Sequence, residues 1–255
     1  MFDTAGRGYS VLRDILRRTD GQPPMTIVGL PAARRHRPPR VDGVYVPQAD
    51  SQLLIETIER TCLAHRASVL DLCTGSGVAA IAAAELGADR VTAFDICSRA
   101  VRCARDNARA AGVDIAVRQG PWDDALRYAP FDLVVANPPY VPSPRHGGPV
   151  RSAGGPEWSW NGGADGRLVL DPLCHSAAAL LGKGGSLLLV QSALAGVGQS
   201  LVALRAVGLT AQVAAVRHIP FGPVLSAHAG WLESTGQVPY GCRVEQLVVI
   251  RADKP

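Results

Sequence analysis

The sequence has no uninterrupted apolar run long enough to cross a membrane, and its arginine-bearing start lacks the apolar core of a secretory signal. It also lacks any CxxC pair and any cluster of histidines, although it contains six scattered cysteines. These absences make a disulfide framework and a zinc site unexpected. They favour a cytoplasmic protein that needs no metal and has no contact with a membrane.

Apolar residues are plentiful, since 47% of the 255 residues are hydrophobic and 19% are charged, which is enough for a large core. The net charge of +4 is concentrated at the start. Eight arginines and three aspartates give residues 1–40 a charge of +5, which leaves −1 for the rest. A basic leader can meet RNA or an acidic partner, but a solvated tail is the simpler interpretation. We expect an Arg/Pro-rich extension over residues 1–44 and a single domain over 45–255.

Strand and helix patterns alternate along that domain. Strands are expected at residues 68–72, 91–94, 115–118, 131–136 and 186–191, and helices at 78–86, 98–111, 167–181 and 198–207. A further helix, capped by Asp50 or Ser51, precedes them. A Gly/Pro-rich insertion spans 142–166, and the apolar runs 210–216 and 244–250 can close the sheet as an antiparallel pair. The pattern predicts an α/β fold with a doubly wound, mostly parallel seven-stranded sheet.

A glycine-rich loop follows the first predicted strand, where open α/β sheets bind ligands beyond the carboxyl ends of their strands. Its residues are Asp71, Leu72, Cys73, Thr74, Gly75, Ser76 and Gly77. Glycines let the backbone approach a ligand, and free N–H groups at the start of the next helix favour a carboxylate. Asp71 can receive a cationic amino group. The methionine part of S-adenosylmethionine (SAM) carries both of these charges, so the loop suits this cofactor.

Asp95 ends the next predicted strand, 18 residues after Gly77, where its carboxylate can accept both hydroxyls of a ribose. This acid does not by itself separate SAM from a dinucleotide. Residues 75–80 also satisfy the G-x-G-x-x-G/A fingerprint of NAD sites. Asp71, four residues before the first glycine, and the motif after the fourth strand favour SAM over NAD.

The tetrapeptide Asn137-Pro138-Pro139-Tyr140 follows the fourth predicted strand and indicates the chemistry. The prolines restrain the backbone and leave carbonyls free to accept hydrogen bonds. Asn137 Oδ1 and the Pro138 carbonyl can each accept one hydrogen of a planar NH2 group while Tyr140 stacks on it. Hydrogen bonds that strengthen as the nitrogen becomes tetrahedral stabilise the transition state. The motif therefore predicts methylation of an amide or amino nitrogen without a metal or a covalent nucleophile.

Together these motifs resemble those of the HemK-like protein glutamine N5-methyltransferases, which modify translation release factors. The segment from Tyr45 to Leu54 is similar to the Y-x-P-x-x-D-[ST]-x-L-L pattern of the short, HemK2-type branch. Residues 160–167 are similar to its W-x-G-G-x-x-G-R segment, and residues 243–251 to its closing strand. The resemblance covers residues 45–250 and implies a Rossmann-like class I methyltransferase with a release factor as protein substrate. Whether a small activating subunit is required stays open.

The resemblance also implies roles for single residues. Asp71 and residues 73–77 would hold the methionine part of SAM, Asp95 and the adjacent Ile96 the ribose side, and Trp122 the adenine. Residues 137–140 would bind the target glutamine, with Asn137 also bordering the cofactor. Pro121 departs from the family, which usually has an acid near the adenine edge, so Asp123 or the backbone would have to substitute. The helical substrate domain of the long HemK type is missing as well.

Three other classes of protein stay open at this point. An amino-methyltransferase of adenine or cytosine would use the same tetrapeptide on a flipped base, as would an enzyme acting on a small molecule. The nearly neutral domain after residue 40 offers no clear basic channel, so nucleic acid is expected to be met only indirectly. A SAM-binding module without catalysis would not need the intact motif from Asn137 to Tyr140. An NAD-dependent oxidoreductase is the remaining alternative.

Overall fold

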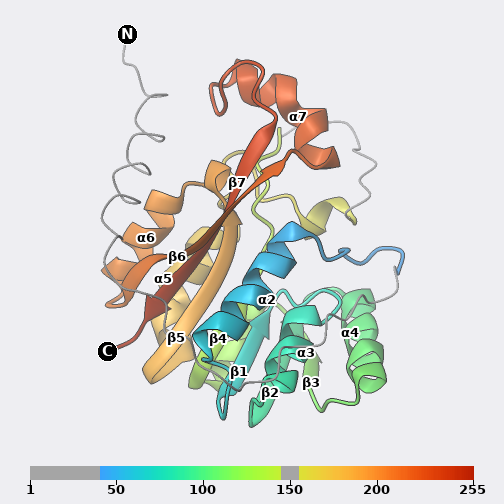
Figure 1. Ribbon diagram of the computed structural model, residues 1–255, viewed down its shortest axis with the longest axis vertical. Coiled ribbons are helices and arrows are strands. Elements are labelled where there is room, and N and C mark those ends of the chain that lie inside the picture. Colours follow the sequence, from blue (N-terminus) through green and yellow to red (C-terminus); the bar gives the residue numbers. More distant parts are fainter. Residues whose placement is uncertain (1–40, 145–154) are drawn as a thin grey trace.

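The computed structural model describes residues 41–144 and 155–255, so nearly all of the predicted extension and the middle of the insertion lie outside the described residues. Seven strands of this part of the chain form one sheet in the order β3-β2-β1-β4-β5-β7-β6 (Figure 1). They are β1 (Ser68–Leu72), β2 (Arg90–Asp95), β3 (Ala116–Gln119), β4 (Phe131–Ala136), β5 (Leu181–Ser192), β6 (Thr210–Pro220) and β7 (Val244–Asp253). Strand β7 runs antiparallel to β5 and β6, whereas the neighbouring pairs among β1 to β5 are parallel. The predicted sheet is confirmed.

Helices cover both faces of the sheet. On one face α2 (Ala49–Thr61), α3 (Val78–Glu85) and α4 (Ser98–Ala111) lie side by side, and on the other α5 (Leu170–Leu180) packs against α6 (Val197–Ala206) (Figure 1). Short 3-10 turns are η1 (Trp122–Tyr128), η2 (Glu157–Ser159) and η3 (Ala193–Ala195). Of the helices in the described residues, none is long and apolar enough to span a membrane.

The core lies where β1 and β4 pair at the centre of the sheet. Their side chains are buried almost completely, as in Leu70, Leu72, Leu133 and Val135. Both strands read as nearly continuous apolar runs, which is expected of parallel strands that are covered on both faces. Burying such residues supplies most of the favourable free energy of folding, at about 25 cal/mol per Å² of apolar surface.

Two local expectations from the sequence were wrong, and one helix was missed. Helix α2 begins at Ala49 with no side-chain cap, so neither Asp50 nor Ser51 caps it. The helix expected at 167–181 begins at Leu170, because Gly166 has a φ of +77° and Asp165 Oδ1 accepts from the Arg167 backbone N–H. Helix α7 (Pro223–Ser234), between β6 and β7, was not expected at all.

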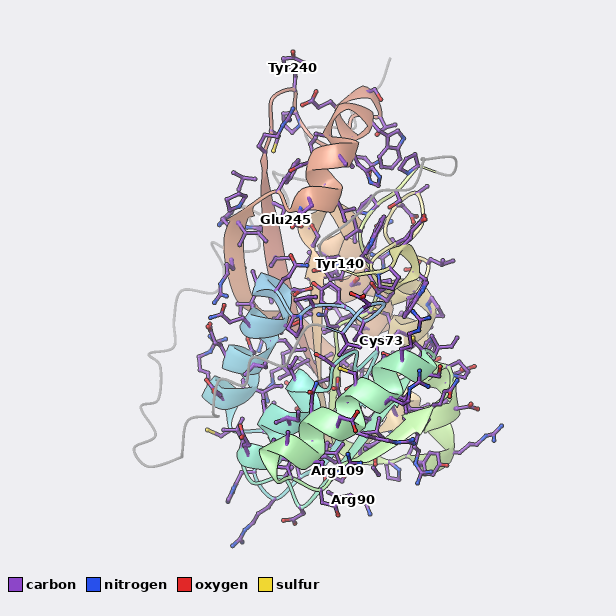
Figure 2. The ribbon with its side chains drawn as sticks, turned by 90° about the vertical axis from the view of Figure 1, so that its right-hand side faces the viewer. Cys73, Arg90, Arg109, Tyr140, Tyr240 and Glu245 are labelled. Atoms are coloured by element: carbon purple, nitrogen blue, oxygen red, sulfur yellow. The ribbon has the colours of Figure 1, made fainter. Side chains whose placement is uncertain are left out.

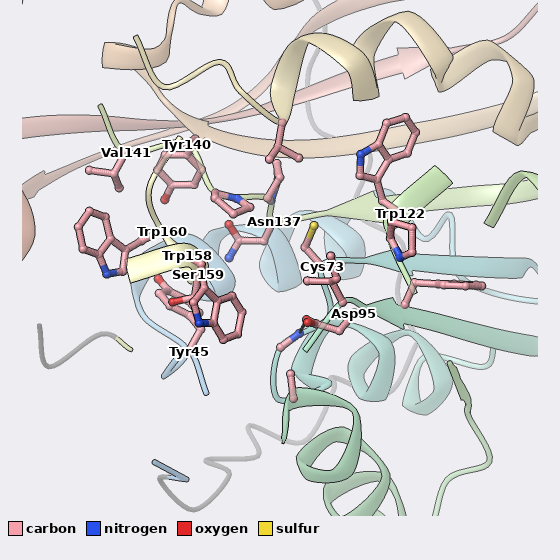
Figure 3. A pocket seen from close by; sticks show the side chains of 18 of the residues that line it. Tyr45, Cys73, Asp95, Trp122, Asn137, Tyr140, Val141, Trp158, Ser159 and Trp160 are labelled. Atoms are coloured by element: carbon pink, nitrogen blue, oxygen red, sulfur yellow. Dashed lines mark hydrogen bonds between the residues drawn. The ribbon is translucent and has the colours of Figure 1, made fainter. Parts of the chain in front are cut away.

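The topology places the loops after β1, β2 and β4 together. Strands β1 and β4 are neighbours in the sheet although two strands separate them in the sequence. Such a switch point opens a crevice beyond the carboxyl ends of the strands, and open α/β sheets bind ligands there. A cavity lies at this position, and Asn137 from the end of β4 faces it together with Cys73 and Asp95 from β1 and β2 (Figure 3).

Candidate active site

The cavity gathers residues from several separate segments of the chain that meet at the carboxyl edge of the sheet. It is lined by Tyr45, Asp50, Cys73, Gly75, Phe94, Asp95, Ile96, Ala100, Gly120, Pro121, Trp122, Asn137, Pro138, Pro139, Tyr140, Val141, Trp158, Ser159, Trp160 and Val169. Aromatic side chains gather at one end, where Tyr140, Trp158 and Trp160 lie, and Trp122 stands at the other (Figure 3). Cys73, Asp95 and Asn137 lie between the two ends. The cavity is therefore long enough to divide into two compartments.

The glycine-rich loop turns sharply between β1 and α3. Cys73, Gly75 and Gly77 all have positive φ, at 57°, 56° and 85°. A side chain at Gly77 would also lie 3.1 Å from the Cβ atom of Ala104, so a glycine is required there for α3 to pack on α4. The loop exposes Cys73 and Gly75 to the cavity, whereas Thr74, Ser76 and Gly77 are buried beneath it and do not line it.

Asp71 lies within the domain and not at the cavity surface. Its Oδ2 accepts hydrogen bonds from Thr74 Oγ1 at 2.5 Å and from the Ala80 backbone N–H at 3.1 Å. Burial raises the pKa of Asp71 to about 7, and these two hydrogen bonds oppose that shift. In this geometry the carboxylate ties the loop to the first turn of α3. The expected contact of Asp71 with an amino group of the ligand stays a prediction.

Asp95 lies at the end of β2 with its carboxylate at the cavity. Its Oδ2 accepts from the Gly75 backbone N–H at 2.8 Å, and its Oδ1 accepts from the Cys97 backbone N–H at 2.9 Å. Burial raises the pKa of Asp95, and the two backbone hydrogen bonds lower it. Each carboxylate oxygen can accept more than one hydrogen bond, so both can still receive a ribose hydroxyl.

Flat apolar surfaces flank Asp95. Phe94, Ile96 and Trp122 line this part of the cavity, and Ile96 is 66% exposed. Pro121 lines it too, whereas the exposed Asp123 does not. A carboxylate that can accept hydrogen bonds from a diol, next to these apolar walls, would fit the adenosine part of SAM. The expected contact of Asp123 or of the backbone with the adenine edge stays a prediction.

The four residues of the Asn-Pro-Pro-Tyr motif all line the cavity. The Asn137 amide is held from behind, because its Nδ2 donates to Asp50 Oδ2 at 3.2 Å and to Ser51 Oγ at 3.3 Å. The Tyr140 hydroxyl also donates to Asp50 Oδ2, at 3.0 Å. Burial and the adjacent Asp50 carboxylate raise the pKa of Tyr140 well above its usual range. With both hydrogens of Nδ2 engaged, the oxygen of the Asn137 amide is the end that can still accept a hydrogen bond.

Sequence reasoning missed several residues of the cavity wall. Tyr45 was noted only as part of a family pattern, and Asp50 only there and as a helix cap, yet the Tyr45 hydroxyl donates to Asp50 Oδ2 at 2.7 Å. Trp160 is 5% exposed and packs on His228 of α7, with ring centroids 6.0 Å apart. The available signal for Asp50 was an acid in the first turn of an amphipathic helix, five residues after a tyrosine.

Glu245 is a second buried acid close to this cluster. Figure 2 shows Glu245 above Tyr140, and Cys73 below both. Its Oε2 has no hydrogen-bond partner among the described residues. Burial raises the pKa of Glu245 to about 7; a hydrogen bond with Ser192 lowers it, and the Asp50 carboxylate raises it further.

Comparison with known proteins agrees with this geometry. The profile of the ribosomal protein L11 methyltransferase family (PrmA) matches residues 49–138. A chain in the structure of the E. cuniculi Mtq2-Trm112 complex, described as responsible for methylation of the termination factor eRF1, has a TM-score of 0.56 and 23% identity. It covers 84% of this chain and 99% of its own length. The fold and the cavity thus define a Rossmann-like methyltransferase of the class that uses SAM.

The names of the sequence relatives also state which molecules those proteins methylate. A protein of Methanocaldococcus jannaschii named as an N5-glutamine methyltransferase is 28% identical over 73% of this chain and 91% of its own length. The release factor glutamine methyltransferase of Mycolicibacterium smegmatis is 34% identical over 56% of this chain. The present chain spans 52% of that enzyme, about half its length. A Streptomyces pristinaespiralis methyltransferase of 4-amino-L-phenylalanine is 34% identical over 69% of this chain and 63% of its own length. The resemblance to HemK-like protein glutamine methyltransferases is confirmed.

Proposed function

We propose that this protein is a cytoplasmic enzyme that methylates the side-chain amide nitrogen of a glutamine in a translation release factor. The observation that carries the proposal is the orientation of Asn137, whose Nδ2 donates to Asp50 and Ser51. Its Oδ1 is left to accept a hydrogen from an NH2 group. The names of the two glutamine methyltransferases among the relatives support glutamine as the target.

The cavity divides between cofactor and target in this proposal. Cys73 and Gly75 approach the methionine part of SAM, Asp95 accepts the ribose hydroxyls, and Trp122 packs on the adenine. The buried Asp71, Thr74, Ser76 and Gly77 shape the loop from beneath. When bound, SAM supplies an electrophilic methyl group. The aromatic end of the cavity, with Tyr140, receives the flat amide and excludes water from it.

Asn137 and the Pro138 carbonyl bind the two hydrogens of the target NH2 group. An amide nitrogen is a poor nucleophile because its lone pair is delocalised into the carbonyl group. Two acceptors that hold the hydrogens let the nitrogen become tetrahedral, and they attract the positive charge that develops on it. These hydrogen bonds strengthen along the reaction, so they lower the barrier more than they favour substrate binding.

Two further parts of the proposal concern regions beyond the cavity. The Mtq2 neighbour forms a complex with Trm112. A small activating subunit of the present protein would cover the apolar surface around the cavity, where Ile96 and Trp158 are exposed. The basic extension over residues 1–44 would act as an appendage of the 45–255 domain and meet the ribosome or another acidic partner.

A methyl-transfer assay tests the proposal. The purified protein is incubated with methyl-labelled SAM and with release factors of its own organism, and the products are mapped by mass spectrometry. We expect one methyl group on a glutamine, and none on a factor in which that glutamine is replaced by alanine. An aromatic amine, 4-amino-L-phenylalanine, is included because one relative acts on it. Transfer to this amine without transfer to any release factor would replace the proposed substrate.

A further inference from the structure

We propose that Asp50 is a positioning residue that fixes the side-chain amide of Asn137 with its oxygen toward the cavity. The inference rests on the proposed function, since it gives Asn137 the task of accepting a hydrogen from the substrate. Asp50 is 5% exposed and lies in the first turn of α2, 87 positions before Asn137. It therefore reaches the end of β4 only through the tertiary fold.

The two ends of an asparagine amide are nearly equal in shape and opposite in hydrogen bonding. Turned by 180°, Asn137 would offer two N–H donors to the cavity and would repel an incoming NH2 group. Two acceptors prevent this turn: Asp50 Oδ2 and Ser51 Oγ both receive a hydrogen bond from Nδ2. In the turned state the Asn137 oxygen would face a carboxylate oxygen at the same distance, so the observed orientation is strongly favoured.

Asp50 itself is held in place by donors on all sides. Its Oδ2 receives the hydroxyls of Tyr45 at 2.7 Å and Tyr140 at 3.0 Å. Its Oδ1 receives the Ser51 backbone N–H at 2.6 Å and the Ser51 hydroxyl at 3.3 Å. A carboxylate that accepts this many hydrogen bonds is held in one position. Its effect on the reaction passes through Asn137.

The same arrangement has an electrostatic consequence for substrate choice. A negative charge behind the Asn137 amide polarises it and makes its oxygen a stronger acceptor. The cavity is thereby matched to a target nitrogen that carries hydrogens and gains positive charge. It is mismatched to a carboxylate such as that of glutamate, which the carboxylates of Asp50 and the nearby Glu245 would repel when ionised. Asp50 thus selects for the amide.

Nuclear magnetic resonance tests the orientation without using activity. In the full-length 15N-labelled protein, the side-chain NH2 signal of Asn137 is assigned by its loss in Asn137→Ala. We expect slow hydrogen exchange of this NH2 group in the wild type and exchange at least tenfold faster in Asp50→Ala. Tyr45→Phe is the matched control, because it removes a donor to Asp50 and leaves the carboxylate in place, and it should keep the slow exchange. Unchanged exchange in Asp50→Ala would overturn the proposal.

Kinetics test whether Asp50 acts through Asn137. We expect Asp50→Ala to lower kcat roughly tenfold to a hundredfold, with the KM for SAM nearly unchanged. The double variant with Asn137→Ala should have the same kcat as Asn137→Ala alone. If the losses of the two single variants multiply instead, the residues act independently and the proposal is contradicted. Asp50→Asn keeps the shape of the side chain and can still accept one hydrogen bond from Asn137. Its kcat should therefore lie between those of the wild type and Asp50→Ala, and it replaces the alanine variant if that one does not fold. Asp89→Asn is the control that should leave kcat unchanged, because the exposed Asp89 precedes β2 at the amino ends of the strands, away from the cavity. If Asn137→Ala itself retains normal turnover, the proposed role of Asn137 in the mechanism fails, and the exchange measurement still decides whether Asp50 fixes its orientation.

Discussion

Asp95 Oδ2 accepts a hydrogen bond from the backbone N–H of Gly75 at 2.8 Å, which ties the end of β2 to the loop after β1. One carboxylate thus shapes the loop and faces the cavity. Replacing Asp95 should affect the cofactor in two ways, by removing the ribose contacts and by releasing the loop.

We expect Asp95→Ala to weaken SAM binding at least tenfold in isothermal titration calorimetry. Hydrogen bonds to a charged acceptor contribute on the order of 1.5 to 3 kcal/mol each. Asp123→Ala is the companion variant, because Asp123 lies in the adjacent turn and does not line the cavity. It should bind SAM normally, and a loss as large as that of Asp95→Ala would show that it contacts the cofactor.

Tyr140→Phe should lower turnover less than tenfold, because its hydroxyl donates to Asp50 at 3.0 Å and is not left for the substrate. The ring, which supplies the flat surface, is retained. Tyr140→Ala should cost far more, since it removes the stacking partner and opens a cavity. Steady-state kinetics of both variants separate the two roles. Equal losses would assign the hydroxyl a direct part in the reaction.

Glu245 should make stability depend on pH. Its pKa is about 7 in the folded protein and ordinarily 4.5, so between these values the folded state keeps a proton that the unfolded state has lost. Stability from this group is full below pH 4.5 and is lost as the pH rises through 7. Glu245→Gln should therefore gain relative to the wild type between pH 5 and 8, by on the order of 3 kcal/mol at most. Denaturant unfolding of both proteins at pH 5 and at pH 8 measures this gain. If the free energies of unfolding of the two proteins differ by the same amount at both pH values, the burial of the charge is contradicted.

Removing the basic extension should leave the domain folded. A protein that begins near Arg40 is expected to keep the melting temperature of the full chain, because the charge and proline content of residues 1–40 disfavour packing on a core. Differential scanning calorimetry of the two proteins makes the comparison. A large drop would mean that the extension packs on the domain.

The sequence predicted those features that depend on neighbouring residues. Alternating apolar runs located the seven strands, and the positions of Gly75, Asp95 and Asn137 at strand ends placed them on one edge of the sheet. Asp50 could not be assigned, because its partner Asn137 is 87 positions away and the contact depends on how α2 packs. Asp71 and Asp123 have the residue types of ligands, and only tertiary burial and exposure place them off the cavity surface. Helix α7 escaped notice because Gly230 interrupts a short apolar pattern.

The central claim is that Asn137 organises methyl transfer to an amide nitrogen, and single-turnover transfer by Asn137→Ala tests it most directly. The substrate is a release factor, or the glutamine-containing loop of one, with SAM at saturation and folding checked by circular dichroism. We predict a rate roughly 10² to 10³ lower than that of the wild type, the cost of losing one preorganised transition-state hydrogen bond. A variant that transfers methyl groups to the glutamine at a nearly normal rate would show that the tetrapeptide is a structural turn and that the proposed mechanism is wrong.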